Sequence, residues 1–215
     1  MCIRDRLEAI LAKVVASRCL RQVAVDALGI HGGRAFLVGH PLGDSFHDHF
    51  AAGIYEGESD LLGLALFKGI AKHHPLASKK TPLEWMRWRC SQSLKYFSSK
   101  EDTTLLDGEL RDLAIQARRS LVATSVVADR LLRSHGKKLV EQQLILANLS
   151  DQIQGLISCL AVIHLADRKA DDVSRHAAIC WCRPVIMKFL GKPLGSCDYK
   201  RLAELGRCSL RSHSD

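Results

Sequence analysis

The sequence predicts an all-α protein, and three observations lead to this prediction. Apolar residues recur at three- and four-residue spacing along most of the chain, as they do on the buried face of a helix. Only five prolines occur in 215 residues, and Leu, Ala and Arg are frequent, which favours helices. No segment alternates apolar and polar residues in the way that a half-buried strand does.

The first predicted unit, residues 7–75, begins with a long helix. Apolar residues at helical spacing run through residues 5–28, from Leu7 to Leu28. Gly29 and the pair Gly32-Gly33 follow, and glycine accepts the left-handed backbone that ends many helices. We therefore expect the helix to end at these glycines.

The rest of this unit leads to a second helix. Residues 34–46 contain a proline and glycines and predict a loop or a short helix, and residues 47–52 predict a helical turn. A helix is then predicted over residues 60–73. Glu58 and Ser59 open it, because acidic and hydroxyl groups suit the positive N-terminal end of a helix.

Residues 76–104 predict a linker with one short helix, at about residues 82–97, before a second helical unit at residues 105–208. The tail, residues 209–215, is expected to fray. Within the second unit the apolar spacing predicts four helices. Their ranges are 106–134, 140–166, 174–190 and, for a short final helix, 198–207.

Composition limits the classes of function. The net charge is +8, but only 6% of residues are aromatic and no nucleic-acid motif occurs, so we expect no nucleic-acid partner. None of the eight cysteines forms a CxxC pair, so we expect reduced thiols in a cytoplasmic protein. The sequence contains no run of 18 uncharged apolar residues, so we expect no membrane-spanning helix. The first six residues, MCIRDR, read like a translated sequencing adapter, so we expect 1–6 to be a non-native start.

Two short motifs in the first unit carry the chemical signal. His31-Gly32-Gly33 follows the first helix, and Ile54-Tyr55-Glu56-Gly57 precedes the second. A carboxylate between a glycine and a helix N-terminus is placed to act as a base on a substrate laid against it. In order and spacing the two motifs resemble the C-terminal domain of acyl-CoA dehydrogenases, which are FAD enzymes. A metal site is not expected, because the histidines have no matching carboxylate cluster.

The resemblance implies a role for each motif residue. Glu56 would take the α-proton of a fatty acyl-CoA thioester, and Tyr55 and Gly57 would contact the substrate. FAD would accept the hydride, as in fatty acid β-oxidation. An electron-transfer flavoprotein or a similar acceptor would then take the electrons from FAD. His31, Gly32 and Gly33 would contact FAD bound by a neighbouring subunit of a homo-oligomer. Glu58 would lie near the flavin or the phosphates of FAD.

Three positions depart from the family pattern. Gly29 stands where the family usually has glutamine, and Glu58 stands where it has threonine. His47-Asp48 replaces the usual Arg-Asp pair. These changes leave the base in place, but Gly29 lacks the side chain that would make a hydrogen bond to the cofactor.

The second unit is similar to the extra C-terminal helical domain of very-long-chain acyl-CoA dehydrogenases. The similarity rests on HGKKLVEQQLIL from His135 and on Cys180-Trp181-Cys182. It implies peripheral contact with a membrane, at the inner mitochondrial membrane or matrix if the source is eukaryotic. Basic residues that could meet anionic lipid are Arg118, Arg119, Arg130, Arg133, Lys137 and Lys138.

Two other interpretations remain open. The chain could belong to a non-catalytic homologue that serves as an assembly or scaffold protein. It could also be an unrelated helical interaction module in which both motifs are coincidental. Under the enzyme interpretation the domain that holds the flavin ring precedes this chain, so we expect the 215 residues alone not to turn over substrate.

Overall fold

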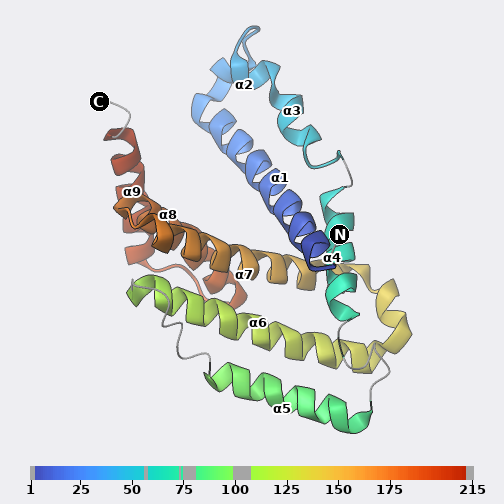
Figure 1. The fold of residues 1–215 in the computed structure, drawn as a ribbon. Helices are drawn as coiled ribbons and strands as arrows, with labels where there is room; N and C mark the ends of the chain where they lie inside the picture. Colours follow the sequence, from blue (N-terminus) through green and yellow to red (C-terminus); the bar gives the residue numbers. More distant parts are fainter. Residues whose placement is uncertain (1–2, 56–57, 73, 75–80, 99–107, 212–215) are drawn as a thin grey trace.

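The computed structural model describes most of the chain as helices, arranged as Figure 1 shows. The described residues are 3–55, 58–72, 74, 81–98 and 108–211. All regular secondary structure within them is helical, which confirms the predicted fold class.

The elements follow the predicted order along the chain. They are α1 (Ile3–His31), η1 (Gly32–Phe36), α2 (Pro41–Asp44), α3 (Phe46–Ala51), α4 (Ser59–Ala71), α5 (Pro82–Ser98), α6 (Gly108–His135), η2 (Gly136–Glu141), α7 (Gln143–Lys169), α8 (Asp172–Phe189) and α9 (Ser196–Arg211).

The end of α1 differs slightly from the prediction. The helix continues through Gly29 to His31, and the backbone first turns left-handed at Gly32, where φ is +57°. Gly29 takes the ordinary helical conformation, so the motif His31-Gly32-Gly33 itself forms the end of the helix.

The body of the molecule is built around α7. Helices α6 and α8 pack against α7 and against each other, α5 lies on α6, and α9 lies on α8 (Figure 1). Helix α4 crosses α7 and also contacts α1. The C-terminal half of α1 leaves the body, and together with η1, α2 and α3 it forms an arm at the top of Figure 1.

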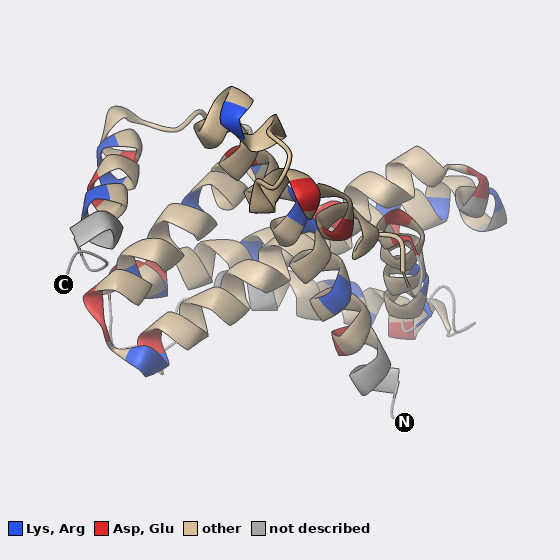
Figure 2. Cartoon of the chain, turned by 90° about the horizontal axis from the view of Figure 1, so that it is seen from above, with Lys and Arg blue, Asp and Glu red and all other residues tan. Residues whose placement is uncertain are grey.

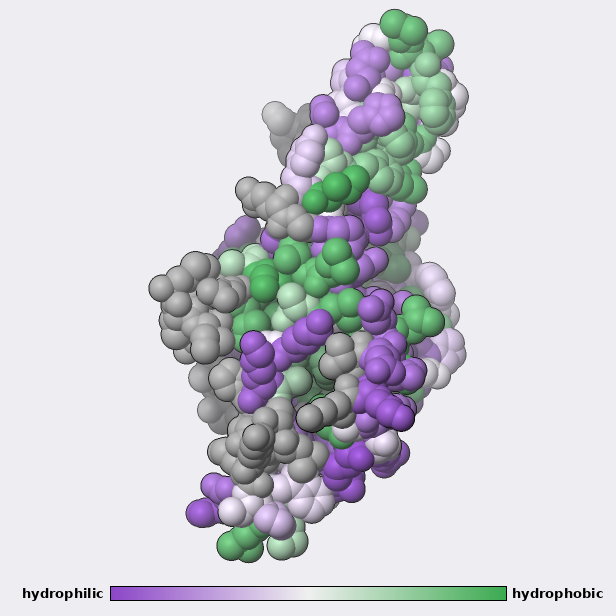
Figure 3. Space-filling view, turned by 90° about the vertical axis from the view of Figure 1, so that its right-hand side faces the viewer, coloured by the Kyte–Doolittle hydropathy of each residue, from purple (hydrophilic) through white to green (hydrophobic). Residues whose placement is uncertain are grey.

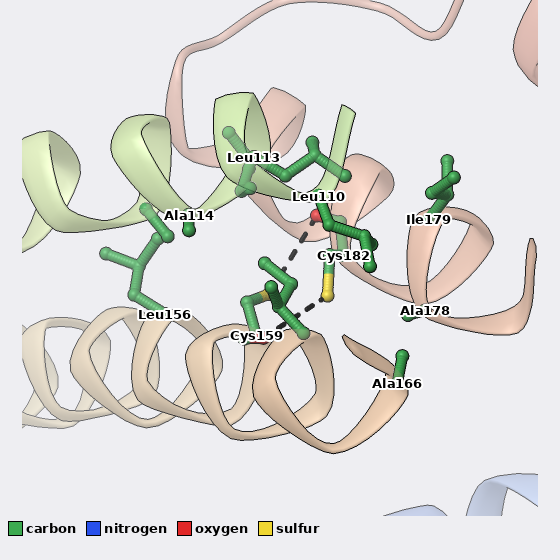
Figure 4. Packing of buried hydrophobic residues seen from close by; sticks show 12 residues of the cluster. Leu110, Leu113, Ala114, Leu156, Cys159, Ala166, Ala178, Ile179 and Cys182 are labelled. Carbon is green, nitrogen blue, oxygen red and sulfur yellow. Dashed lines mark hydrogen bonds between the residues drawn. The ribbon is translucent and has the colours of Figure 1, made fainter. Parts of the chain in front are cut away.

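The larger hydrophobic cluster lies between α6, α7 and α8. Figure 4 shows its centre, where the buried thiols of Cys159 and Cys182 lie together. Each thiol donates to the carbonyl oxygen of the other residue, at 3.9 Å from Cys159 and 3.5 Å from Cys182. The hydrogen bond with Cys159 and burial raise the pKa of Cys182 far above its usual value. We conclude that Cys182 is an inert core residue, since the thiolate is the reactive form.

A smaller cluster joins the two predicted units. Phe67 of α4 packs with Leu146, Leu149 and Ile153 of α7 and with Leu139 of η2. The first unit therefore shares a hydrophobic core with the second, although the two units are far apart in sequence.

A buried carboxylate holds α5 against α6. Asp129 of α6 is 1% exposed and accepts hydrogen bonds from Trp85 Nε1 at 2.7 Å and Arg89 at 2.8 Å, both on α5. Arg133, one turn further on α6, donates from Nε at 3.1 Å. A buried carboxylate is tolerated only when it is paired and hydrogen-bonded, so this cluster fixes where α5 lies.

Helix α4 approaches α7 closely because the residue at the crossing is a glycine. The Gly63 carbonyl accepts a hydrogen bond from Ser150 Oγ at 2.5 Å, and Gln154 Nε2 donates to the same Ser150 oxygen at 2.8 Å. A Cβ at Gly63 would lie 2.9 Å from Gln154 Nε2 and 3.3 Å from Ser150 Oγ. Only glycine leaves room for these polar contacts.

Helix α7 is long and apolar enough to span a membrane by length and composition alone, and it is the one described helix that is. Several of its apolar residues are buried against α4, α6 and α8, as expected for the central helix of a helical bundle. A core helix passes the same test of length and composition, so this helix is weak evidence for a span.

Gly63→Val should lower the free energy of unfolding by about 1–3 kcal/mol, because the added methyl groups overpack the crossing of α4 and α7. Chemical denaturation of the purified chain measures the change. Gly29→Val is the matched control, since a Cβ at Gly29 meets no atom within 4 Å. Equal stability losses in both variants would contradict the close approach at Gly63.

Candidate functional site

The segment that leads into α4 is fastened to α1 by polar contacts. Ser59 Oγ donates to the Gly53 carbonyl at 3.2 Å and lies 3.0 Å from Ser17 Oγ of α1. Lys13 Nζ also reaches the Gly53 carbonyl, at 3.5 Å. Because Ser17 and Ser59 are both buried, these bonds fix the two sides of the predicted catalytic segment.

The predicted base and its neighbour, Glu56 and Gly57, lie outside the described residues. On one side of them, Tyr55 is 70% exposed and Ile54 is also exposed. On the other side, the Glu58 carboxylate accepts hydrogen bonds from the backbone N–H groups of Asp60, at 2.8 Å, and Leu61, at 3.0 Å. Glu58 is therefore the N-cap of α4.

A small hollow of about 120 Å³ lies beside this segment. Arg18 and Arg21 of α1, Phe50, Ile54 and the first residues of α4 form its walls. A site for part of a substrate needs such a recess, but the volume is that of a small group and not of a whole acyl chain.

Arg18 lines this hollow and was not predicted as a site residue. Its guanidinium lies 2.7 Å from Asp60 of α4 and 2.8 Å from Asp151 of α7, and it donates to Gln154 at 3.3 Å. Burial lowers the pKa of Arg18, but the hydrogen bonds with Asp151 and Asp60 outweigh it and leave the pKa above its usual value. Nothing in the periodicity of α1 distinguishes this arginine from its neighbours, so only the structure reveals that it joins three helices.

The second motif lies at the far end of α1. His31 ends the helix, and the rings of His31 and His40 meet edge to face with centroids 5.2 Å apart. His31, Gly32 and Gly33 are exposed, and a Cβ on either glycine would meet no atom within 4 Å. His31 follows Ser17 by 14 residues of continuous helix, or about 20 Å. The structure therefore places the turn at Gly32 about 20 Å along α1 from Ser17, which contacts the segment before α4.

The tip of the arm beyond this motif is apolar and exposed. Phe36 is 79% exposed, and Leu37 and Val38 are also largely exposed. Figure 3 shows hydrophobic surface at the upper end of the molecule, where the arm lies. The end of the arm therefore exposes three consecutive apolar side chains to the surroundings.

Among the residues that the structure describes, no group of three or more His, Cys, Asp or Glu side chains could hold a metal ion. His40 and His49 instead make local hydrogen bonds. His40 Nδ1 accepts from the Leu42 N–H at 3.3 Å and caps α2, and His49 Nε2 lies 3.3 Å from Ser45 Oγ.

Comparisons with known proteins connect this geometry with one family. Residues 3–71 match the family model for the acyl-CoA dehydrogenase C-terminal domain. The structure is similar to a crystal structure of an acyl-CoA dehydrogenase complexed with FAD from Bacillus anthracis, with a TM-score of 0.67 and 16% sequence identity. The similarity covers 94% of this chain and 35% of that one. Curated protein sequences give no match.

These findings support the expected resemblance at the level of the family's C-terminal domain and its fold. The matched segment contains α1 to α4 and both motifs. At 16% identity the structural similarity establishes the fold alone, and this chain spans about a third of the length of the Bacillus anthracis protein.

Ser59→Ala should destabilise the chain by about 1–2 kcal/mol, since it removes a buried hydroxyl that bonds both Gly53 and Ser17. It should also speed amide hydrogen exchange near Gly53 and at the start of α4. Ser93→Ala is the control, because Ser93 is exposed and bonds only a carbonyl of its own helix. Unchanged exchange in the Ser59 variant would show that the bond does not hold the segment.

Proposed function

We propose that this chain is the C-terminal part of an FAD-dependent acyl-CoA dehydrogenase, which catalyses α,β-dehydrogenation of a fatty acyl-CoA in fatty acid β-oxidation. The match of residues 3–71 to the C-terminal domain of that family is the observation that carries the proposal. The fold of nearly the whole chain supports it. An electron-transfer flavoprotein or a similar carrier would take the electrons.

Glu56 is the proposed base. Its place between the fastened Gly53 and the capped start of α4 supports this role, because a base must be held at a fixed position against the substrate. In a closed, apolar pocket the carboxylate would be poorly solvated, so its pKa would rise and it would become a stronger base for the α-proton. Tyr55 and Gly57 would flank the thioester.

The exposed turn His31-Gly32-Gly33 suits one edge of an FAD site. Its backbone is open to an approaching group, since no atom lies where a Cβ on either glycine would point. FAD supplies the hydride acceptor when it is bound. The distance of about 20 Å along α1 from Ser17, beside the proposed catalytic segment, to His31 supports a homo-oligomer, in which this turn meets the cofactor of a neighbouring subunit. Glu58 fits this site less well, because its carboxylate already caps α4.

A second candidate is a non-catalytic homologue that acts as an assembly or scaffold protein. The departures from the family pattern at Gly29 and Glu58 favour it, because both positions lie beside the proposed cofactor contacts. The two candidates differ in whether Glu56 is needed for chemistry.

In the full-length protein, Glu56→Gln should lower the rate of acyl-CoA oxidation by about 10²–10⁴-fold, because the amide cannot accept the α-proton. An assay with a dye as electron acceptor measures this rate. Glu204→Gln, an exposed position on α9, is the control and should retain activity. If the wild-type protein binds no FAD and oxidises no acyl-CoA, the scaffold function is supported instead.

We also propose a peripheral membrane contact through the end of α6 and η2. Arg130 and Lys138 are exposed there, whereas Arg133 is partly engaged by Asp129. Figure 2 shows acidic residues among the basic ones over the molecule, so any attraction to anionic lipid would be local. Each basic residue near such a surface contributes about 1 kcal/mol. The protein would then be cytoplasmic or in the mitochondrial matrix, at the inner membrane face.

Replacing Arg130 and Lys138 together by Gln should reduce co-sedimentation with anionic vesicles by about tenfold or more at low salt. The matched double variant, Lys188→Gln with Lys200→Gln, removes the same charge from α8 and α9 and should bind like the wild type. Binding that is equal in all three proteins, or that does not fall with added salt, would refute this contact.

A further inference from the structure

A cavity of about 360 Å³ lies between α4, α5, α6 and α7, away from the segment of the proposed base. Its apolar walls come from all four helices: Phe67, Ile70, Trp88, Leu121, Ile153 and Ile157. An apolar cavity of about 150 Å³ is enough to bind benzene. This cavity therefore has room for a larger molecule, and the core of a helical bundle is a common place for such a site.

Two hydroxyl groups belong to the cavity wall, and both already donate their protons. Thr124 Oγ1 donates to the Ser120 carbonyl at 2.9 Å, and Ser125 Oγ donates to the Val122 carbonyl at 2.7 Å. Each oxygen still has a lone pair, so a hydroxyl here can accept a hydrogen bond from a ligand but cannot easily donate one.

His74 is the third polar residue of the wall. It is 8% exposed, its ring meets Trp88 edge to face at 4.4 Å, and its Nε2 lies 3.4 Å from Asp129 Oδ1. Burial lowers the pKa of His74 and the Asp129 carboxylate raises it, with the net result below its usual value. The imidazole is therefore neutral at pH 7, and none of the described residues that line the cavity is charged there.

The side chains that line the cavity determine which class of ligand can bind there. A charged group would lose its hydration without meeting an opposite charge, so an ionised ligand is disfavoured. An aliphatic segment would fill the apolar space, and a neutral hydroxyl or amide N–H could donate to the hydroxyl oxygens of Thr124 and Ser125.

We propose that this cavity binds an uncharged, mostly apolar small molecule, namely a medium-chain aliphatic alcohol or amide, with its donor group against Thr124 or Ser125. The site is separate from the proposed dehydrogenase site. Its α4 residues, Phe67 and Ile70, belong to the second half of that helix, whereas the segment of Glu56 precedes the first half.

The test uses 1-decanol as the probe with the full 215-residue chain. Isothermal titration should show saturable binding, and a brominated analogue should quench the fluorescence of Trp88, which lies in the wall. Decanoate, which has the same length but a charge, should bind at least tenfold more weakly. Decanoate binding as tight as decanol would overturn the assignment of an uncharged ligand.

Ala128→Leu places a larger side chain in the cavity and should reduce decanol affinity by at least tenfold. Ala123→Leu is the matched control on the same helix, outside the wall, and should bind like the wild type. Because Ala128→Leu could unfold the chain, Ala71→Leu fills the same cavity from α4, and circular dichroism checks both variants. Absence of decanol binding to the wild type, or binding unchanged by both filling variants, would overturn the proposal.

Discussion

The close crossing of α4 over α7 at Gly63 is the contact that joins the N-terminal helices to the rest of the structure. It lets the Gly63 carbonyl reach Ser150, and it brings Phe67 into the cluster shared with α7. Arg18 then joins α1 to both helices through Asp60 and Asp151. The segment matched to the acyl-CoA dehydrogenase family is thus held on the later helices by a close glycine crossing, by a shared hydrophobic cluster and by the ion pairs of a half-buried arginine.

The polar groups that hold the backbone in place differ from the groups proposed to contact substrate or cofactor. The fastened loop, the cap at Glu58 and the clamp at Arg18 all use polar groups that are already hydrogen-bonded, so they position the backbone. The groups proposed to meet substrate or cofactor, Tyr55 and the turn at Gly32, are exposed instead. Such a division is expected where a rigid scaffold presents a loop to a molecule that arrives from outside.

The helices could be predicted from sequence, but the contacts between them could not. Apolar periodicity located the long helices that the structure describes, and in α6, α7 and α8 the apolar residues at this spacing form a buried core. It gave no reason to select Gly63, which looks like an ordinary glycine in an apolar helix. It also gave no sign that Asp129 pairs with Trp85, 44 residues earlier in the chain. Polar contacts between residues far apart in the sequence produce no periodic pattern in it.

The candidate site was predicted from motif order, and the structure extends that prediction only in part. It locates the turn at Gly32 and the cap at Glu58, and it adds Arg18, but Glu56 lies outside the described residues. A motif indicates which residue types occur together. It does not indicate which side chains already serve the fold, as Glu58 does.

The arm has a consequence for how the chain behaves as a purified sample. Phe36, at the end of η1, and Leu37 and Val38, which follow it, are largely exposed. Apolar side chains at the end of a projecting arm are easily reached by other molecules. The tendency of the purified chain to self-associate should therefore depend strongly on protein concentration and on added detergent. Polar replacements at these three positions are the natural first step towards a well-behaved preparation.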